Sequence, residues 1–197
     1  MVVIRHSGLN LFMEVFIMIT EKVMLKSSLQ YSDDRKKRYV LSVEWDKDKK
    51  KACVIMLSSG QANGIVFDRT TTHCIENLIE LDYGSVDIVN LFATIGNGKS
   101  VIDDGIDEEN LKTIKKSASV AEMIVFAVGT GKQNDKRVQK CQSTVLEELS
   151  EYVEKMFCIA DADDRKFYHP LCPKVRKWKL LKFSAEELTE KEQCADD

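Results

Sequence analysis

From residue 38 onward, short apolar runs alternate with amphipathic segments, and this alternation restricts the chain to few folds. Four runs have the length and apolar content of buried strands: 52–58, 86–94, 123–129 and 156–161. The segments between them have apolar residues at helical spacing: 71–82, 107–122 and 135–155. Strands that alternate with helices predict an α/β domain of three layers, α/β/α, around a central, mostly parallel, four-stranded sheet.

One more strand pattern, RYVLSVEW at 38–45, comes before these runs. A short charged turn separates it from the run at 52–58, and two apolar runs about such a turn predict a hairpin. The run at 52–58 is apolar on both faces, which is typical of a central strand covered on both sides. We therefore expect an N-terminal hairpin strand beside the four-stranded sheet.

The length of 197 residues is ordinary for a single domain, which we place at 26–183. Residues 1–25 are apolar but interrupted by polar and charged residues. They are therefore too broken for a membrane span and are expected to be an N-terminal extension. They also lack the small-residue cleavage site of a secretory signal. Residues 184–197 are rich in Asp and Glu and are expected to be an acidic tail.

None of the six cysteines forms a CxxC pair, which argues against a zinc ribbon. Cys53 and Cys158 lie in apolar runs, where reduced buried thiols are expected, and this indicates a cytoplasmic protein. His73 and Cys74 are neighbours on a predicted helix and point in different directions, so shared metal ligation is not expected. Residues 93–100 imitate a phosphate-binding loop but lack its first glycine. We expect neither a metal nor a cofactor.

Positive charge is concentrated between residues 165 and 182, which hold seven basic residues and no acid in a chain of net charge −3. Both prolines of the chain lie there as well, beside His169. Such a local field attracts phosphates or a protein that imitates them. The alternative is a solvated strand or helix face from which Trp178, Leu180 and Leu181 return to the core.

The loops beyond the carboxyl ends of parallel strands form one working edge. Four sequence features fall on that edge in chain order, and together they resemble the uracil-DNA glycosylase superfamily. They are Gly60-Gln61-Ala62-Asn63-Gly64-Ile65, Asn90, Val125-Phe126-Ala127-Val128-Gly129 and His169-Pro170-Leu171.

The chain is also similar to an uncharacterised bacterial family that has related motifs in the same order. The matching residues here are Ile55-Met56-Leu57-Ser58-Ser59, Asp68-Arg69-Thr70, Asn90-Leu91-Phe92-Ala93 and His169-Pro170-Leu171.

The glycosylase resemblance implies a scaffold for extruding a base and cleaving its bond to the sugar. It also implies a degenerate site made of Gln61, Ala62, Asn63, Asn90 and His169. Ala62 stands where the family has its catalytic Asp, and Gly64 stands where it has a tyrosine. Asn63 cannot replace the missing carboxylate as a base. We therefore expect an inactive branch of the superfamily, with no catalytic residue.

The same resemblance implies a mode of binding. Family enzymes wedge a leucine of the last loop into DNA, and acidic proteins that mimic DNA inhibit them by capturing that leucine. We expect such an acidic inhibitor as partner, so that binding would regulate glycosylase inhibition. The expected contact residues are Gln61, His169, Leu171, Lys174, Arg176 and Lys177.

Other interpretations stay open at this point. An enzyme with altered chemistry could use His169 with Asp68, the nearest downstream carboxylate. A nucleic-acid-binding module is a further alternative, although net negative charge argues against strong phosphate-driven binding. Leu171 could also be an ordinary buried loop residue. A homodimer is compatible with the sequence, and no membrane partner is expected.

Overall fold

The computed structural model describes residues 18–96, 107–129, 131 and 134–183. Most of the expected extension and all of the expected acidic tail lie outside these residues. The elements in chain order are β1 (Lys26–Tyr31), β2 (Arg38–Glu44), β3 (Lys50–Ser59), α1 (Arg69–Glu80), β4 (Tyr83–Ile95), α2 (Glu108–Val120), β5 (Met123–Phe126), α3 (Lys136–Glu148), η2 (Ser150–Lys155), β6 (Met156–Ala160), η3 (Pro173–Val175) and β7 (Lys179–Lys182).

The strands form one seven-stranded sheet in the order β1-β2-β4-β3-β5-β6-β7. Its central strands β4, β3, β5 and β6 pair in parallel, whereas β1, β2 and β7 pair antiparallel at the two sides. The expected α/β class with a parallel centre is confirmed. The sheet is wider than the expectation of four strands and a hairpin strand.

The predicted hairpin between β2 and β3 is wrong. β2 pairs with β1 and β4, so β4 lies between β2 and β3. The connection crosses the start of β4, where the backbone N–H groups of Trp45 and Asp46 both donate to the carbonyl of Gly84. A Cβ at Gly84 would lie 1.9 Å from the carbonyl oxygen of Asp46, so only glycine permits this crossing.

Two edge strands were missing from the sequence prediction. β1 is mostly exposed and so lacks an apolar run. β7 lies in the basic segment, where Trp178 is buried and Leu180 and Leu181 are half-buried. This matches the interpretation of the segment as a solvated strand that returns apolar residues to the core.

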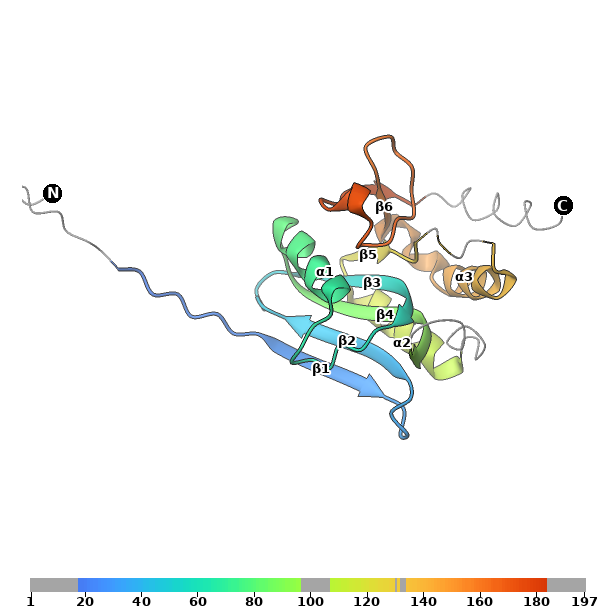
Figure 1. The fold of residues 1–197 in the computed structure, drawn as a ribbon, viewed down its shortest axis with the longest axis horizontal. Coiled ribbons are helices and arrows are strands. Elements are labelled where there is room, and N and C mark those ends of the chain that lie inside the picture. Colours follow the sequence, from blue (N-terminus) through green and yellow to red (C-terminus); the bar gives the residue numbers. More distant parts are fainter. Residues whose placement is uncertain (1–17, 97–106, 130, 132–133, 184–197) are drawn as a thin grey trace, which may run out of the picture.

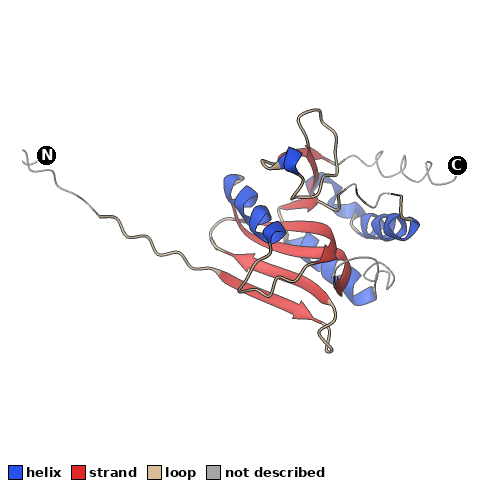
Figure 2. Ribbon diagram, viewed as in Figure 1, coloured by secondary structure: helices blue, strands red, loops and turns tan. Residues whose placement is uncertain are grey.

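Helices cover both faces of the sheet, giving three layers (Figures 1 and 2). Along β3 the buried side chains alternate between two core clusters. Cys53 and Ile55 pack with residues of α2 and α3, whereas Val54 and Met56 pack with residues of α1. The expectation that this strand is central and covered on both sides is therefore confirmed.

Each α-helix begins after an aspartate whose carboxylate accepts a backbone hydrogen bond from the first turn. These caps are Asp68 for α1, Asp107 for α2 and Asp135 for α3. The long helix predicted at 135–155 is divided. The α-helix ends at Glu148, and the 3₁₀ helix η2 continues the chain towards β6.

The cysteines within the described residues carry free thiols, and all except the half-buried Cys172 are buried. Burial raises the pKa of Cys53 and of Cys74, which makes both thiols unreactive. Among the helices that the structure describes, none is both long enough and apolar enough to cross a bilayer.

Two neighbours on α1 test this packing. Leu78 is fully buried under the sheet, whereas Ile79 is 50% exposed. We expect Leu78→Ala to lower the free energy of unfolding by about 2–5 kcal/mol, because it leaves a cavity in the core. Ile79→Ala is expected to change it by only about 0.5 kcal/mol. Urea unfolding measures both, and equal losses would contradict this placement of α1.

Candidate functional site

The loops after β3, β5 and β6 leave the sheet at the same edge, because these strands are parallel. Arg38, the first residue of β2, lies under the loop that follows β3 and is 1% exposed. Its Nη1 donates to the carbonyl oxygens of Gly60 at 3.3 Å and Ala62 at 2.9 Å. Burial lowers the pKa of Arg38, and the charge of Asp68 opposes that shift. A guanidinium stays protonated in proteins, so a buried positive charge holds this loop.

The loop residues expected to form a degenerate site point in different directions. Gln61 is exposed, whereas the methyl group of Ala62 is buried in the core cluster on the α1 side of the sheet. The Oδ1 of Asn63 accepts from the backbone N–H groups of Ile65 and Val66, at 3.1 and 2.8 Å. Asn63 therefore shapes the loop as an Asx turn, with its Oδ1 engaged by the backbone of that loop.

Gly64 has a structural role in this loop. Its φ is +83°, and a Cβ there would lie 2.5 Å from the Cδ1 of Leu29. The hydroxyl of Ser27 donates to the Gly64 carbonyl. The loop thus lies directly against β1, and both its backbone conformation and its close approach require glycine.

Asn90 lies inside β4 and is fully buried. Its Nδ2 donates to the hydroxyl of Ser59 at 3.1 Å, and that hydroxyl donates to the carbonyl of Arg38 at 3.1 Å. The amide of Asn110 on α2 donates to the carbonyl of Asn90. These contacts join the end of β3 to β2 and α2, while Oδ1 of Asn90 has no partner in the described part of the chain.

His169 and Asp68 lie at the same edge of the sheet. Asp68 accepts from the N–H of Thr71 at 2.8 Å, and a Cβ on Gly60 would lie 2.3 Å from its Oδ2. Gly129, with φ of +84°, lies against His169, to whose Cβ an added Cβ would come within 3.0 Å. Burial lowers the pKa of His169, and the charge of Asp68 acts in the opposite direction.

The ring of His169 is oriented by its own loop. The backbone N–H of Leu171 donates to Nδ1 of His169 at 3.2 Å. In the neutral ring this hydrogen bond assigns the proton to Nε2. His169 can therefore present a hydrogen-bond donor from Nε2.

The basic segment is partly neutralised. Acids far away in sequence pair with three of its lysines: Lys177 with Glu80 at 3.2 Å, Lys179 with Asp164 at 2.6 Å and Lys182 with Glu154 at 3.2 Å. Arg165 pairs with Asp161 and Asp163. Lys174 and Arg176 are exposed and have no acid partner among the described residues. The expected positive field is thus smaller than the count of basic residues suggests.

Asn77 fixes the basic segment to α1. Its Oδ1 accepts from the N–H of Trp178 at 2.9 Å, and its Nδ2 donates to the carbonyl of Arg176 at 3.2 Å. The same Nδ2 lies 3.3 Å from Nε2 of His73, whose Nδ1 is 3.5 Å from Glu76. Cys74, by contrast, is fully buried in the core cluster between α1 and the sheet. His73 and Cys74 thus have separate surroundings.

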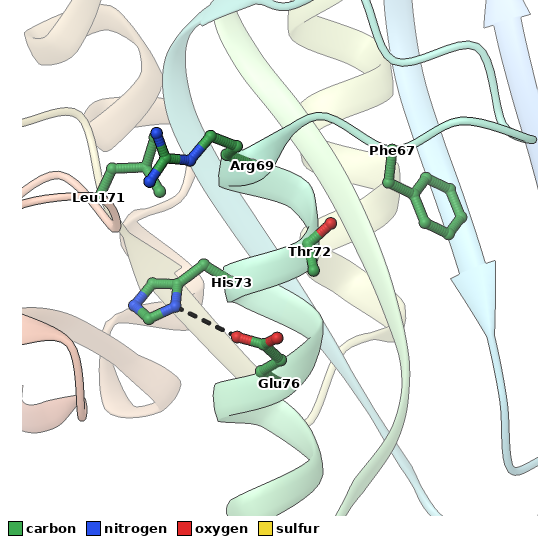
Figure 3. Close-up of a pocket in the computed structure, with 6 residues that line it drawn as sticks. All are labelled: Phe67, Arg69, Thr72, His73, Glu76 and Leu171. Carbon is green, nitrogen blue, oxygen red and sulfur yellow. Dashed lines mark ion pairs between the residues drawn. The ribbon is translucent and has the colours of Figure 1, made fainter.

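A cleft of about 290 Å³ lies between α1 and the His-Pro-Leu loop (Figure 3). The side chain of Arg69 extends towards Leu171 across it. Leu171 is 41% exposed, so it is not the buried loop residue of the alternative interpretation. The lining residues are Phe67, Arg69, Thr72, His73, Glu76 and Leu171.

Sequence reasoning missed Arg38 and Arg69. The signal for Arg38 was present as a charge at the start of an otherwise apolar strand. No comparable signal marked Arg69, because its place in the cleft depends on Leu171, in a loop about a hundred residues later.

A protein-family model matches residues 38–171, from the first residue of β2 to Leu171, and its description is "Protein of unknown function (DUF1643)". The chain belongs to this family. The matched range of the DUF1643 family includes the sheet edge and the cleft, whereas β1, Lys174 and Arg176 lie outside it. No curated protein matches the chain significantly. The second resemblance, to an uncharacterised family, agrees with this finding, and the resemblance to uracil-DNA glycosylases stays an interpretation.

His169 provides a test of this geometry by NMR. We expect its midpoint of titration below the ordinary value of 6.5, because burial disfavours the imidazolium. Asp68→Asn should lower that midpoint further by removing a favourable charge, while asparagine still caps α1. A midpoint that rises or stays constant in Asp68→Asn would contradict the coupling of these two residues.

The lowered pKa of His169 also determines how this residue makes the stability of the fold depend on pH. Below pH 6.5 the unfolded chain binds a proton at His169 before the folded chain does. The contribution of His169 to stability therefore falls as pH drops from about 6.5 through its lower folded pKa.

Proposed function

We propose that this protein acts by binding, on an inactive scaffold of the uracil-DNA glycosylase type, and that its partner is an acidic protein that imitates DNA. The recognition surface consists of Gln61, Arg69, His169, Leu171, Lys174, Arg176 and Lys177. Capture of a DNA-mimicking glycosylase inhibitor would release the inhibited enzyme. The protein would then regulate base-excision repair without excising a base itself.

The observation that carries this proposal is Leu171, an exposed leucine at the rim of a cleft whose opposite side is formed by Arg69. An apolar side chain beside arginines and lysines is the combination that anchors an acidic partner. The apolar group fills a recess, and the surrounding charges match the partner's carboxylates. Lys174 and Arg176 are available for this role, since they have no acid partner among the described residues.

The state of the 60–68 loop supports binding over catalysis. At the position where the resembled enzymes have a carboxylate, the buried methyl group of Ala62 can neither hold a water nor offset positive charge. Asn63, its neighbour, uses its oxygen on its own loop. Loss of one electrostatic group of this kind costs about 10²–10³ in rate.

Leu171→Ala tests the anchor. We expect this variant to bind a purified DNA-mimicking glycosylase inhibitor at least about tenfold more weakly, because truncation removes the apolar contact. Biolayer interferometry with the inhibitor immobilised measures the change. Val120→Ala is the matched control, since Val120 is also exposed but lies at the end of α2. Equal affinity of the parent protein and Leu171→Ala, or no binding by the parent protein, would refute the proposal.

An altered glycosylase is the second candidate, and one observation favours it. Asp68 and His169 lie at the same edge and interact electrostatically, so a carboxylate and an imidazole are available for acid–base chemistry. In this interpretation Asp68 would take the role that Ala62 cannot perform. Its carboxylate is, however, already engaged as the cap of α1.

A base-excision assay separates the two candidates. We expect no release of free base from single- or double-stranded oligonucleotides that carry uracil or other damaged bases, because no carboxylate stands at position 62. Release that drops about 10²-fold or more in Asp68→Asn and in His169→Gln would establish the enzyme instead. Release that both variants retain would indicate a contaminating glycosylase.

A further inference from the structure

The chain enters the sheet through an extended segment that contacts little else. Residues 18–25, which we call the arm, extend away from the body of the molecule before β1 begins (Figure 1). Five large apolar side chains of this arm are more than half exposed: Met18, Ile19, Val23, Met24 and Leu25. Isolated exposed apolar residues are ordinary, but five within eight residues form an apolar surface whose exposure to water is unfavourable.

The arm continues directly into an unprotected sheet edge. β1 pairs only with β2, so the backbone groups along its other side have no strand partner in the described chain. Its sequence, KSSLQY, has one charge and no proline. The opposite edge strand β7, KLLK, has a lysine at each end, which is a common protection against edge-to-edge pairing. Only one of the two sheet edges is therefore suited to accept a further strand.

A second apolar surface lies beside β1. The 60–68 loop packs against Ser27 and Leu29 through Gly64. The next two residues of that loop, Ile65 and Val66, are 90% and 67% exposed. They are thus placed near the face of β1 that carries Leu29, and nothing in the described chain covers them.

We propose that a second copy of this chain pairs antiparallel with the arm and β1 about a two-fold axis, joining two sheets into one. In an antiparallel pair, residues opposite one another lie on the same face of the sheet. When a two-fold axis relates the strands, the opposed residues are also both odd-numbered or both even-numbered. If the arm continues the alternation of β1, Val23 and Leu25 of one copy lie on the face that carries Leu29 in the other. The shared face holds in every register, and a register that sets Val23 and Leu25 opposite Ser27 and Leu29 brings them towards Ile65 and Val66.

A second copy accounts for the open edge and the exposed apolar side chains with one stretch of chain. The same short stretch provides both the open edge and the apolar side chains that need cover, as an isologous interface requires. The charges of the pairing stretch are Glu21 and Lys22 in the arm and Lys26 in β1, so its net charge is small and two identical copies can approach without strong repulsion. The pairing strand does not include any residue of the recognition surface around Leu171, and the inference does not depend on the proposed function.

Sedimentation velocity over a wide range of concentration tests the proposal. We expect the parent protein to approach twice the monomer mass, and Val23→Asp/Leu25→Asp to dimerise at least about tenfold more weakly. The matched control is Ile79→Asp/Val120→Asp, which adds the same charge at exposed apolar positions on α1 and α2. This control is expected to dimerise like the parent protein. Circular dichroism confirms that each variant remains folded.

Several outcomes would overturn the proposal: a parent protein that is monomeric at every concentration, a dimer that survives Val23→Asp/Leu25→Asp, or equal weakening by the control variant. Amide hydrogen exchange gives a second readout. Protection of residues 18–31 should increase with protein concentration, because the pairing is between molecules. Protection that is independent of concentration would show that the arm folds back on its own chain.

Discussion

The central strands of this protein are buried on both faces, and most of the molecule follows from that constraint. Along β3 every residue from Ala52 to Met56 is buried, and β4 is buried from Val86 to Ala93. The buried carboxylate of Asp87 in β4 forms an ion pair with Lys51. Side chains packed between two layers of helix cannot meet a partner. The proposed recognition surface therefore lies at the strand ends, where the loops after β3 and β6 and the first turn of α1 meet.

The buried charge of Arg38 connects this constraint to the surface. Its hydrogen bonds to the carbonyls of Gly60 and Ala62 fix the loop so that Ala62 turns into the core and Gln61 faces water. An uncompensated guanidinium at this depth would be costly, and the nearby charge of Asp68 offsets part of that cost. Because Asp68 also caps α1, one electrostatic arrangement positions the loop, the start of α1 and the surroundings of His169.

The elements that the sequence predicted well are those with strong periodic patterns. The doubly buried strands and the three amphipathic helices have such patterns, since each buries a defined face. β1 could not be found in this way because it buries almost nothing. The hairpin prediction failed because a short charged turn is a local signal, whereas the position of β4 between β2 and β3 is decided by packing across the whole sheet. The cleft between Arg69 and Leu171 depends on tertiary contacts and has no local signature.

The ion pairs of the basic segment show most clearly what a count of basic residues misses. They also bear on the kind of partner that we propose. Glu80, Asp164 and Glu154 neutralise three lysines of the basic segment. Lys174 and Arg176 of that segment, and Arg69 on α1, have no acid partner among the described residues. Polymeric DNA gains affinity by neutralising many phosphates at once, and this surface offers few cations for that purpose. A compact acidic protein needs only a few matched carboxylates and a recess for Leu171. For the binding role proposed above, the arrangement of charge is therefore better suited to an acidic protein than to the nucleic acid that such a protein imitates.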